Sequence, residues 1–245
     1  MNKNVFEYNS IVQYTDVNEN NELSKKGLLR ILLEVAGLHS DYAGYGLNQT
    51  PQTHLAWMIL NWKVKSFYNP HWNSKLSIKT WASDFTRSIS RRQFEVYDED
   101  NNPVAIASSK WILVNAKTHS ISKFTSEILE AYGNGYNKHV FDPDINDKEK
   151  EPENSEYIYE YRIMRRDLDT NHHVDNLFYL DYAYDAIPKD FYNKNFENIE
   201  IMYKKQLLYG DLIKCFYSFD KENNTHIVTI KNENLDIVHA IVKMF

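Results

Sequence analysis

The sequence predicts an α+β protein in which one folding unit occurs twice in tandem. In each half of the 245-residue chain, a short alternating segment leads through a polar turn to an apolar helical pattern, and strand patterns follow. Aromatic residues make up 14% of the chain, which has only 7 glycines and 6 prolines. This composition favours long strands over disorder. An apolar helix beside such strands indicates a helix packed against a sheet.

The first half is expected to contain a strand, a buried helix and several antiparallel strands. Residues 5–14 alternate loosely between apolar and polar side chains, which predicts a strand. Ser24 is placed to cap the next helix, whose apolar residues occur on nearly all sides and so predict burial. Strand patterns begin at residue 55, and 94–114 is expected to form a hairpin. A short helix is expected within 120–132.

A polar stretch separates the two halves. Residues 142–155 are rich in charge and bounded by prolines, a composition typical of a solvated linker. We therefore predict an N-terminal domain over 1–135, a linker over 136–155 and a C-terminal domain over 156–245.

The second half repeats the pattern of the first. Sliding the chain so that Asp16 meets Asp167 also brings Leu29 onto Leu180, without a gap. Two further matches follow in the same order: 73–74 with 210–211, and 104–111 with 237–244. Three matches in one order indicate an internal duplication. Two unrelated α+β domains are the alternative.

Charge and cysteine content exclude some classes of function. The net charge of −6 weighs against non-specific binding of nucleic acid. The single cysteine, Cys215, rules out an internal disulfide framework, and its alternating strand predicts a buried core thiol.

No apolar run approaches the ~20 residues of a membrane span. The N-terminus has no signal-peptide core, so we expect a cytoplasmic protein.

The polar stretch 167–176 carries the candidate chemistry. Asp169, Asn171 and His173 occupy alternate positions, and an extended segment would send all three side chains to one face. A helix is expected to start at Asp175 and to stop at Pro188. The N-terminus of a helix favours negative charge, which suits a developing oxyanion. The alternative is an ordinary polar turn that caps the helix.

This motif resembles a known family. Asp-x-Asn-x-His-Val-x-Asn before an aromatic-rich helix is similar to the signature of the acyl-acyl-carrier-protein thioesterases, and so are segments of the N-terminal half at 16–18, 36–39, 69–74 and 109–114. The resemblance covers nearly the whole chain. It implies two hotdog folds in tandem, each a long central helix wrapped by a curved antiparallel sheet. It also implies release of free fatty acid from acyl carrier protein in bacterial fatty acid biosynthesis.

The resemblance assigns roles to the motif. His173 is the expected general base, since an imidazole titrates near neutral pH. Asn171 would orient the water or the thioester, and Asp169 would orient or polarise its neighbours. We expect the oxyanion to rest on the backbone N–H groups of Val174 and Asp175.

One departure concerns the position where the family carries a catalytic glutamate. Gln206 stands there, and Leu207 replaces a cysteine that often follows. A glutamine can hold a water but cannot take its proton. Either His173 is the sole base, or the enzyme is slow, or activity is lost. Hydrolysis of acyl-coenzyme A, non-catalytic binding of acyl thioesters and a hotdog dehydratase are the alternatives.

The two copies differ at the decisive positions. The first copy has Asn18, Asn20 and Glu22 and therefore lacks the imidazole, so we predict one active site, in the C-terminal half. The N-terminal half would house the acyl chain. The candidates for lining that pocket are Tyr42, Trp57, Met58, Trp62 and Trp81, and for each of them plain core packing is the favoured alternative.

The expected partner is acyl carrier protein, and a homodimer is left open. Because the chain is net negative, docking an acidic carrier would need a local basic face; solvated strand edges are the other explanation of such residues. The candidates are Arg87, Arg91, Arg92, Arg165, Arg166, Lys204 and Lys205. No cofactor is expected. His172, His173 and Asp175 could suggest a metal, but adjacent residues of an extended chain face opposite ways, so we expect none.

Overall fold

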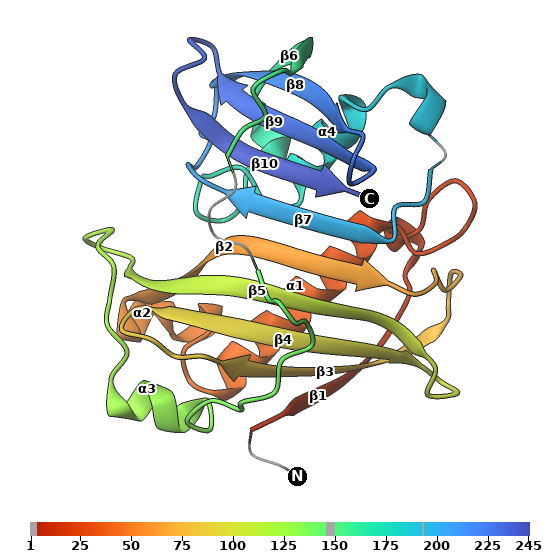
Figure 1. Cartoon of the computed structure of the whole chain (residues 1–245). Helices are drawn as coiled ribbons and strands as arrows, with labels where there is room; N and C mark the ends of the chain where they lie inside the picture. Colours follow the sequence, from red (N-terminus) through yellow and green to blue (C-terminus); the bar gives the residue numbers. More distant parts are fainter. Residues whose placement is uncertain (1–3, 146–149, 193) are drawn as a thin grey trace. The chain divides into compact units, whose positions relative to one another are not determined.

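The chain folds into two compact units, Met1–Ile145 and Asn146–Phe245 (Figure 1). The computed structural model describes residues 4–145, 150–192 and 194–245. The division falls within the predicted linker, and residues 136–145 are grouped with the first unit. No helix among the described residues is long and apolar enough to cross a membrane.

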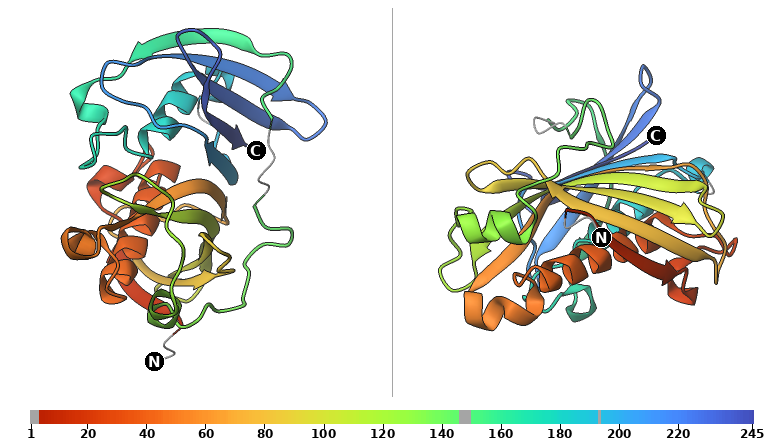
Figure 2. Two further views of the ribbon diagram at one scale, coloured as in Figure 1. Left: turned by 90° about the vertical axis from the view of Figure 1, so that its left-hand side faces the viewer. Right: turned by 90° about the horizontal axis from the view of Figure 1, so that it is seen from below.

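In the first unit, an 18-residue helix lies along one face of an antiparallel sheet (Figures 1 and 2). The strand order is β1-β3-β4-β5-β2. In chain order the elements are β1 (Phe6–Ile11), the 3-10 turn η1 (Tyr14–Asp16), α1 (Lys25–Tyr42), η2 (Leu47–Gln49), α2 (Thr50–Thr53), β2 (Leu55–Ser66), β3 (Lys75–Ser83), β4 (Ile89–Asp98), β5 (Pro103–Asn115) and α3 (Ser126–Ala131). The predicted β4–β5 hairpin and the short helix within 120–132 are confirmed.

The second unit repeats this plan with strand order β6-β8-β9-β10-β7. Its elements are β6 (Glu156–Arg162), η3 (Arg165–Asp167), α4 (Phe178–Asp185), η4 (Lys189–Phe191), β7 (Asn198–Tyr203), β8 (Leu212–Asp220), β9 (Thr225–Asn232) and β10 (Val238–Met244). Cys215 lies on β8 with no exposed surface, as predicted, and burial raises its pKa to about 12.

The predicted duplication is confirmed by topology and by matching hydrogen bonds. If β1 to β5 are renamed β6 to β10, one strand order becomes the other. The N–H of Ser24 donates to the carbonyl of Asp16 at 2.8 Å, and that of Asp175 donates to Asp167 at the same distance. Residues at equivalent positions of two such units have equivalent backbone surroundings, so the copies can be compared position by position.

The start of α1 follows the prediction. The Ser24 side chain accepts a hydrogen bond from the N–H of Gly27 at 2.9 Å, which satisfies one of the free donors of the first turn. A Cβ atom on Gly27 would lie 2.2 Å from the carbonyl oxygen of Asp16. Glycine at this position therefore allows the first turn of α1 to pack directly on the residue that precedes the polar turn.

The helix of the second unit is shorter than we predicted. It has 8 residues and begins at Phe178, because Asp175 instead forms a turn in which its carboxylate accepts from the N–H of Leu177 at 2.8 Å. It ends at Asp185, three residues before Pro188, whose counterpart in the middle of α1 is Gly37. Proline cannot donate to the helical ladder, and it disfavours the helical conformation of the residue before it. The expectation of a long central helix is therefore correct for the first unit only.

The two faces of the first sheet have different neighbours. Arg92 on β4 contacts His39 of α1, so Phe94, two residues further along the strand, faces the helix as well. Gln93 faces the other way and accepts a hydrogen bond from the N–H of Val140 at 3.2 Å. Residues 136–145 thus cross the face of the sheet that is opposite to α1.

Candidate active site

Residues 169–173 form a tight turn, whereas we predicted an extended segment. The N–H of Asp169 donates to the carbonyl of His173 at 2.7 Å, and His172 has a φ of +62°. One carboxylate oxygen of Asp169 accepts from the N–H groups of Asn171 at 2.8 Å and His173 at 3.1 Å. The other accepts from the side-chain amide of Asn171 at 3.2 Å. The carboxylate therefore fixes both the turn and the amide.

A second segment joins this turn. His173, which is half-buried, pairs with Leu208 in an antiparallel bridge. Gln206 lies two residues before Leu208 and is exposed. The structure thus brings together the stretches that carry all four predicted catalytic residues, although no alternation along a strand is involved.

The predicted oxyanion donors are already engaged. The N–H of Val174 donates to the carbonyl of Leu207 at 3.0 Å, and that of Asp175 donates to the carbonyl of Asp167 at 2.8 Å. An N–H group with a carbonyl partner at these distances has no proton to offer an oxyanion. The assignment of Val174 and Asp175 is therefore wrong for this arrangement. Asn176 has a backbone N–H without a partner among the residues the structure describes.

Asp167 is a supporting residue that sequence reasoning did not single out. Its carboxylate is 1% exposed and accepts from the Tyr161 hydroxyl at 2.9 Å and from the N–H of Met164 at 2.8 Å. Since its backbone carbonyl also receives the N–H of Asp175, Asp167 ties β6 to both ends of the turn. The match of Asp16 with Asp167 in the duplication was the available signal.

His239 holds the segment that carries Gln206. It is buried on β10, its Nδ1 lies 3.1 Å from the carbonyl of Lys205, and its own carbonyl accepts from the N–H groups of Lys204 and Lys205. A carbonyl can only accept, so Nδ1 carries the proton. Burial, as the largest cause, lowers the pKa of His239. Nothing in the sequence marked this histidine, because its partner lies 34 residues away.

The five candidates for the acyl pocket lie in different places. Tyr42 is 81% exposed, and Trp81 lies under residues 136–145, where its indole donates to the carbonyl of Lys138 at 2.8 Å. Trp62 is buried against Phe94, on the face that α1 covers. Trp57 is half-buried and donates to the Tyr132 hydroxyl at 3.0 Å, and Met58 follows it on the opposite face of β2. The five residues therefore do not line one cavity, and the prediction is wrong for Tyr42 and Trp81.

Two of the basic docking candidates are also wrong. Arg92 is only 6% exposed, and its Nη1 lies 2.8 Å from His39 Nδ1. Burial lowers the pKa of Arg92 to about 10, and burial together with Arg92 lowers the pKa of His39 to about 2. Arg91 is engaged with Asp84 at 3.2 Å and Asp144 at 3.4 Å. Neither arginine is available to a docking protein.

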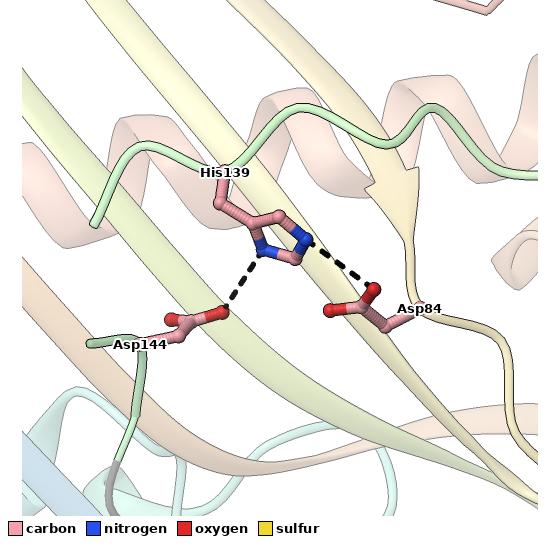
Figure 3. A group of neighbouring side chains, drawn as sticks. All are labelled: Asp84, His139 and Asp144. Atoms are coloured by element: carbon pink, nitrogen blue, oxygen red, sulfur yellow. Dashed lines mark ion pairs between the residues drawn. The ribbon is translucent and has the colours of Figure 1, made fainter. Parts of the chain in front are cut away.

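A group with metal-ligand spacing lies elsewhere in the first unit. Figure 3 shows His139 between Asp84, 3.3 Å from its Nε2, and Asp144, 3.5 Å from its Nδ1. One ligand atom from each residue lies within 4.8 Å of the others. The Arg91 guanidinium contacts both carboxylates, so their charges are already paired with a cation. We interpret the group as an ion-pair cluster that fastens residues 136–145 to the sheet.

Comparison with known proteins places the chain in a family. The family model "Acyl-ACP thioesterase N-terminal domain" matches residues 3–132, and "Acyl-ACP thioesterase C-terminal domain" matches residues 149–243. A chloroplastic oleoyl-acyl carrier protein thioesterase of Coriandrum sativum is 25% identical over 246 residues, which cover 91% of this chain and 65% of that protein. A chloroplastic palmitoyl-acyl carrier protein thioesterase of Cuphea hookeriana is 25% identical over 201 residues, 76% of this chain and 48% of that one. The chain thus spans less than two thirds of the length of these relatives.

Solved structures agree on the fold. An acyl-ACP thioesterase from Bacteroides thetaiotaomicron superposes with a TM-score of 0.87 at 22% identity, covering 100% of this chain and 99% of that one. The 12:0-ACP thioesterase from Umbellularia californica gives 0.83 at 17% identity, covering 98% and 96%. The predicted tandem double hotdog is confirmed. With both domain models matched in order along the chain, the protein belongs to the acyl-ACP thioesterase family.

Proposed function

We propose that this protein is a thioesterase that hydrolyses fatty acyl-acyl carrier protein and releases free fatty acid, in a bacterial cytoplasm. The observation that supports this proposal is the difference between two turns of the same geometry. The turn of the second unit carries Asp169, Asn171 and His173, whereas the first unit has Asn18, Asn20 and Glu22 at these positions. A purely structural turn would not need an imidazole in one copy alone.

His173 acts as the general base in the proposed mechanism. It takes a proton from a water as the water oxygen bonds to the thioester carbonyl carbon. The tetrahedral intermediate then expels the thiol, as the carbon–sulfur bond breaks and the proton returns from His173 to sulfur. The backbone N–H of Asn176 is our replacement for Val174 and Asp175 as the donor that stabilises the oxyanion.

Asp169 and Asn171 prepare the water. The Asp169 carboxylate holds the backbone N–H of His173 and the side-chain amide of Asn171. That contact uses the NH₂ group of Asn171, and its amide oxygen has no partner among the described residues. The oxygen can therefore accept a hydrogen bond from the attacking water and aim it at the carbonyl carbon.

The first unit is our candidate for holding the acyl chain, as the predicted N-terminal domain over 1–135. Trp57 and Trp62 support this role better than the other candidates. Trp62 packs on Phe94, which faces the helix, and Trp57 packs on Tyr132 in an aromatic cluster.

Hydrolysis of an acyl-acyl carrier protein by wild type, His173→Ala and Glu22→Ala tests the proposal. We expect kcat of His173→Ala to fall about 10²- to 10⁴-fold, which is the contribution of a general base. Glu22→Ala, at the equivalent position of the first unit, should keep the wild-type rate. Equal rates for wild type and His173→Ala would contradict the assignment of the base.

Gln206 favours one second candidate, a protein that binds acyl thioesters without hydrolysing them. Wild type that binds an acyl-acyl carrier protein but releases no fatty acid would establish this alternative. An enoyl product from a 3-hydroxyacyl substrate would instead identify a dehydratase.

A further inference from the structure

We propose that an exposed basic surface beside the turn docks the acidic face of the carrier protein. This surface consists of five exposed cationic residues, Arg162, Arg165, Arg166, Lys204 and Lys205, and an apolar centre of Met164, Leu208 and Tyr209. The inference rests on the proposed function, because it names the part of the second unit that recognises the substrate's protein carrier.

Contacts within the second unit join the two segments that carry these residues. The Arg162 guanidinium donates to the carbonyl of Gly210 at 2.9 Å, and that of Arg165 lies 5.8 Å from the centre of the Tyr209 ring. The N–H of Ile163 donates to the carbonyl of Asp211 at 2.9 Å. The end of β6 and the segment that follows β7 are thereby joined, and the His173–Leu208 bridge places the candidate base at their margin.

The centre of the surface is apolar and open. Met164 is 50% exposed, Leu208 is 49% exposed and Tyr209 is 58% exposed. An apolar centre with a charged rim is the composition of a transient protein interface, in which the rim steers the encounter and the centre provides contact area.

The acidic residues nearby are directed at other partners. Asp167 is buried, and the carboxylates of Asp169 and Asp211 accept from backbone N–H groups of their own turns. Arg166 is 76% exposed, with its Nε 3.7 Å from Asp167. Glu156 and Glu160 are exposed acids on β6, and Glu160 is the one nearer to Arg162 along the strand. The whole chain has a net charge of −6, so this surface with its five cations is more basic than the chain as a whole.

The first unit supplies an internal control. The residues at the five equivalent positions there are Ile11, Tyr14, Thr15, Phe67 and Tyr68. None of these is charged, yet the backbone hydrogen bonds correspond: Val12 donates to Ser74 as Ile163 donates to Asp211. The fold therefore does not require cations at these positions, and the copy with the imidazole carries them all.

This arrangement selects a partner of particular chemistry. A protein with an acidic face and an apolar side chain at its centre complements the surface, and a thioester arm from that face would need to reach only the adjacent turn. An uncharged small thioester offers none of these contacts, so it separates docking from chemistry.

The test compares wild type with Arg165→Glu/Arg166→Glu on two substrates, an acyl-acyl carrier protein and the same acyl group on N-acetylcysteamine, at low salt. We expect kcat/KM for the carrier substrate to fall at least tenfold, mainly through KM, and that for the small thioester to change less than twofold. Added salt should lower wild-type kcat/KM on the carrier substrate more than on the small one.

The matched control is Lys189→Glu/Lys221→Glu, which makes the same change in net charge. Lys221 follows β8 at the end remote from Leu212, the residue paired with Arg162, and Lys189 follows α4. This variant should keep the wild-type kcat/KM on both substrates. A carrier-specific fall of the same size in the control would overturn the surface and leave only a net-charge effect.

An equal fall on both substrates, or no fall on either, would also overturn the surface while leaving the proposed hydrolysis intact. If wild type hydrolyses neither substrate, the proposed function fails, and the surface is judged by the Kd for acyl-acyl carrier protein, which should rise at least tenfold in the double variant. Should that variant unfold, Arg165→Gln replaces it in every comparison.

Discussion

The turn at 18–22 and the turn at 169–173 share a backbone and differ in chemistry. In the first turn, the Asn18 side-chain oxygen accepts from the N–H groups of Asn20 and Glu22, each at 3.0 Å. In the second, Asp169 accepts from residues at the same two spacings, and the third central residue of each turn has a φ of +62°. An amide thus builds this turn as well as a carboxylate does. The charge of Asp169 and the imidazole of His173 are additions that the shared scaffold did not need.

The carboxylates that precede the two turns are satisfied differently. Asp16 is fully buried and receives the Arg30 guanidinium, with Nη2 at 2.7 Å. The position equivalent to Arg30 is Asp181, and Asp167 is held by a tyrosine hydroxyl instead. The first copy is therefore braced by an ion pair between the turn and its helix, and the second is braced by a hydrogen bond to its edge strand.

Breaking these braces should produce the largest effects on stability. Asp16→Ala should cost about 3 kcal/mol, the lower end for removing one partner of a buried pair, because Arg30 keeps 31% exposure and can be hydrated. Tyr161→Phe should cost about 1.5 kcal/mol, a typical value for a hydrogen bond to a charged group. Urea unfolding measures both, and equal costs would show that the two braces are equivalent.

Asp169→Asn separates the charge from the turn. Because Asn18 already forms the same hydrogen bonds, the variant should unfold within about 2 °C of wild type. Hydrolysis should fall about 10²-fold, because the carboxylate no longer polarises its neighbours. Asp169→Ala is the companion variant. In addition to the loss of activity, its free energy of unfolding should fall by about 1 kcal/mol, as when a helix cap is removed. Full activity of Asp169→Asn would reduce Asp169 to a turn residue.

The buried histidine of the first unit predicts a pH dependence of stability. The folded pKa of His39 is lowered from 6.5 to about 2, so below pH 6.5 the unfolded chain takes up a proton that the folded chain does not. His39 therefore reduces stability as the pH falls, by about 1.4 kcal/mol per unit. Unfolding free energies of wild type and His39→Gln, measured from pH 7 to about pH 5, should converge toward the acid end. Parallel curves would contradict the assignment.

The smallest expected effect concerns Gln206. A carboxylate at this position can accept a proton, so Gln206→Glu should raise kcat about tenfold. Asn69 is the equivalent residue of the first unit, where its side-chain oxygen accepts from Lys25 at 3.0 Å, and Asn69→Asp is the control. The control should leave kcat unchanged. A decrease in the Gln206→Glu variant would indicate that the glutamine itself holds the water.

Much of the fold could be read from the sequence because the signals are local. The cap at Ser24, the long strands and the break at Pro188 each depend on neighbours along the chain. The duplication was visible because residues such as Asp16 and Asp167 keep their type at a constant shift. The prediction of an extended segment at Asp169, Asn171 and His173 was wrong. The Asp169 carboxylate accepts hydrogen bonds from nearby backbone N–H groups, and these bonds close a turn although the alternating pattern predicts a strand.

The sequence by itself therefore determined the repeat, the two helix–sheet units and the copy that carries the imidazole. Only the tertiary structure decided which groups are available. The N–H of Asp175 donates to the carbonyl of Asp167, and that of Val174 donates to the carbonyl of Leu207. Arg92 is covered by α1. Availability depends on partners that are distant along the chain, and a linear pattern shows the type of a side chain but not what the fold brings against it.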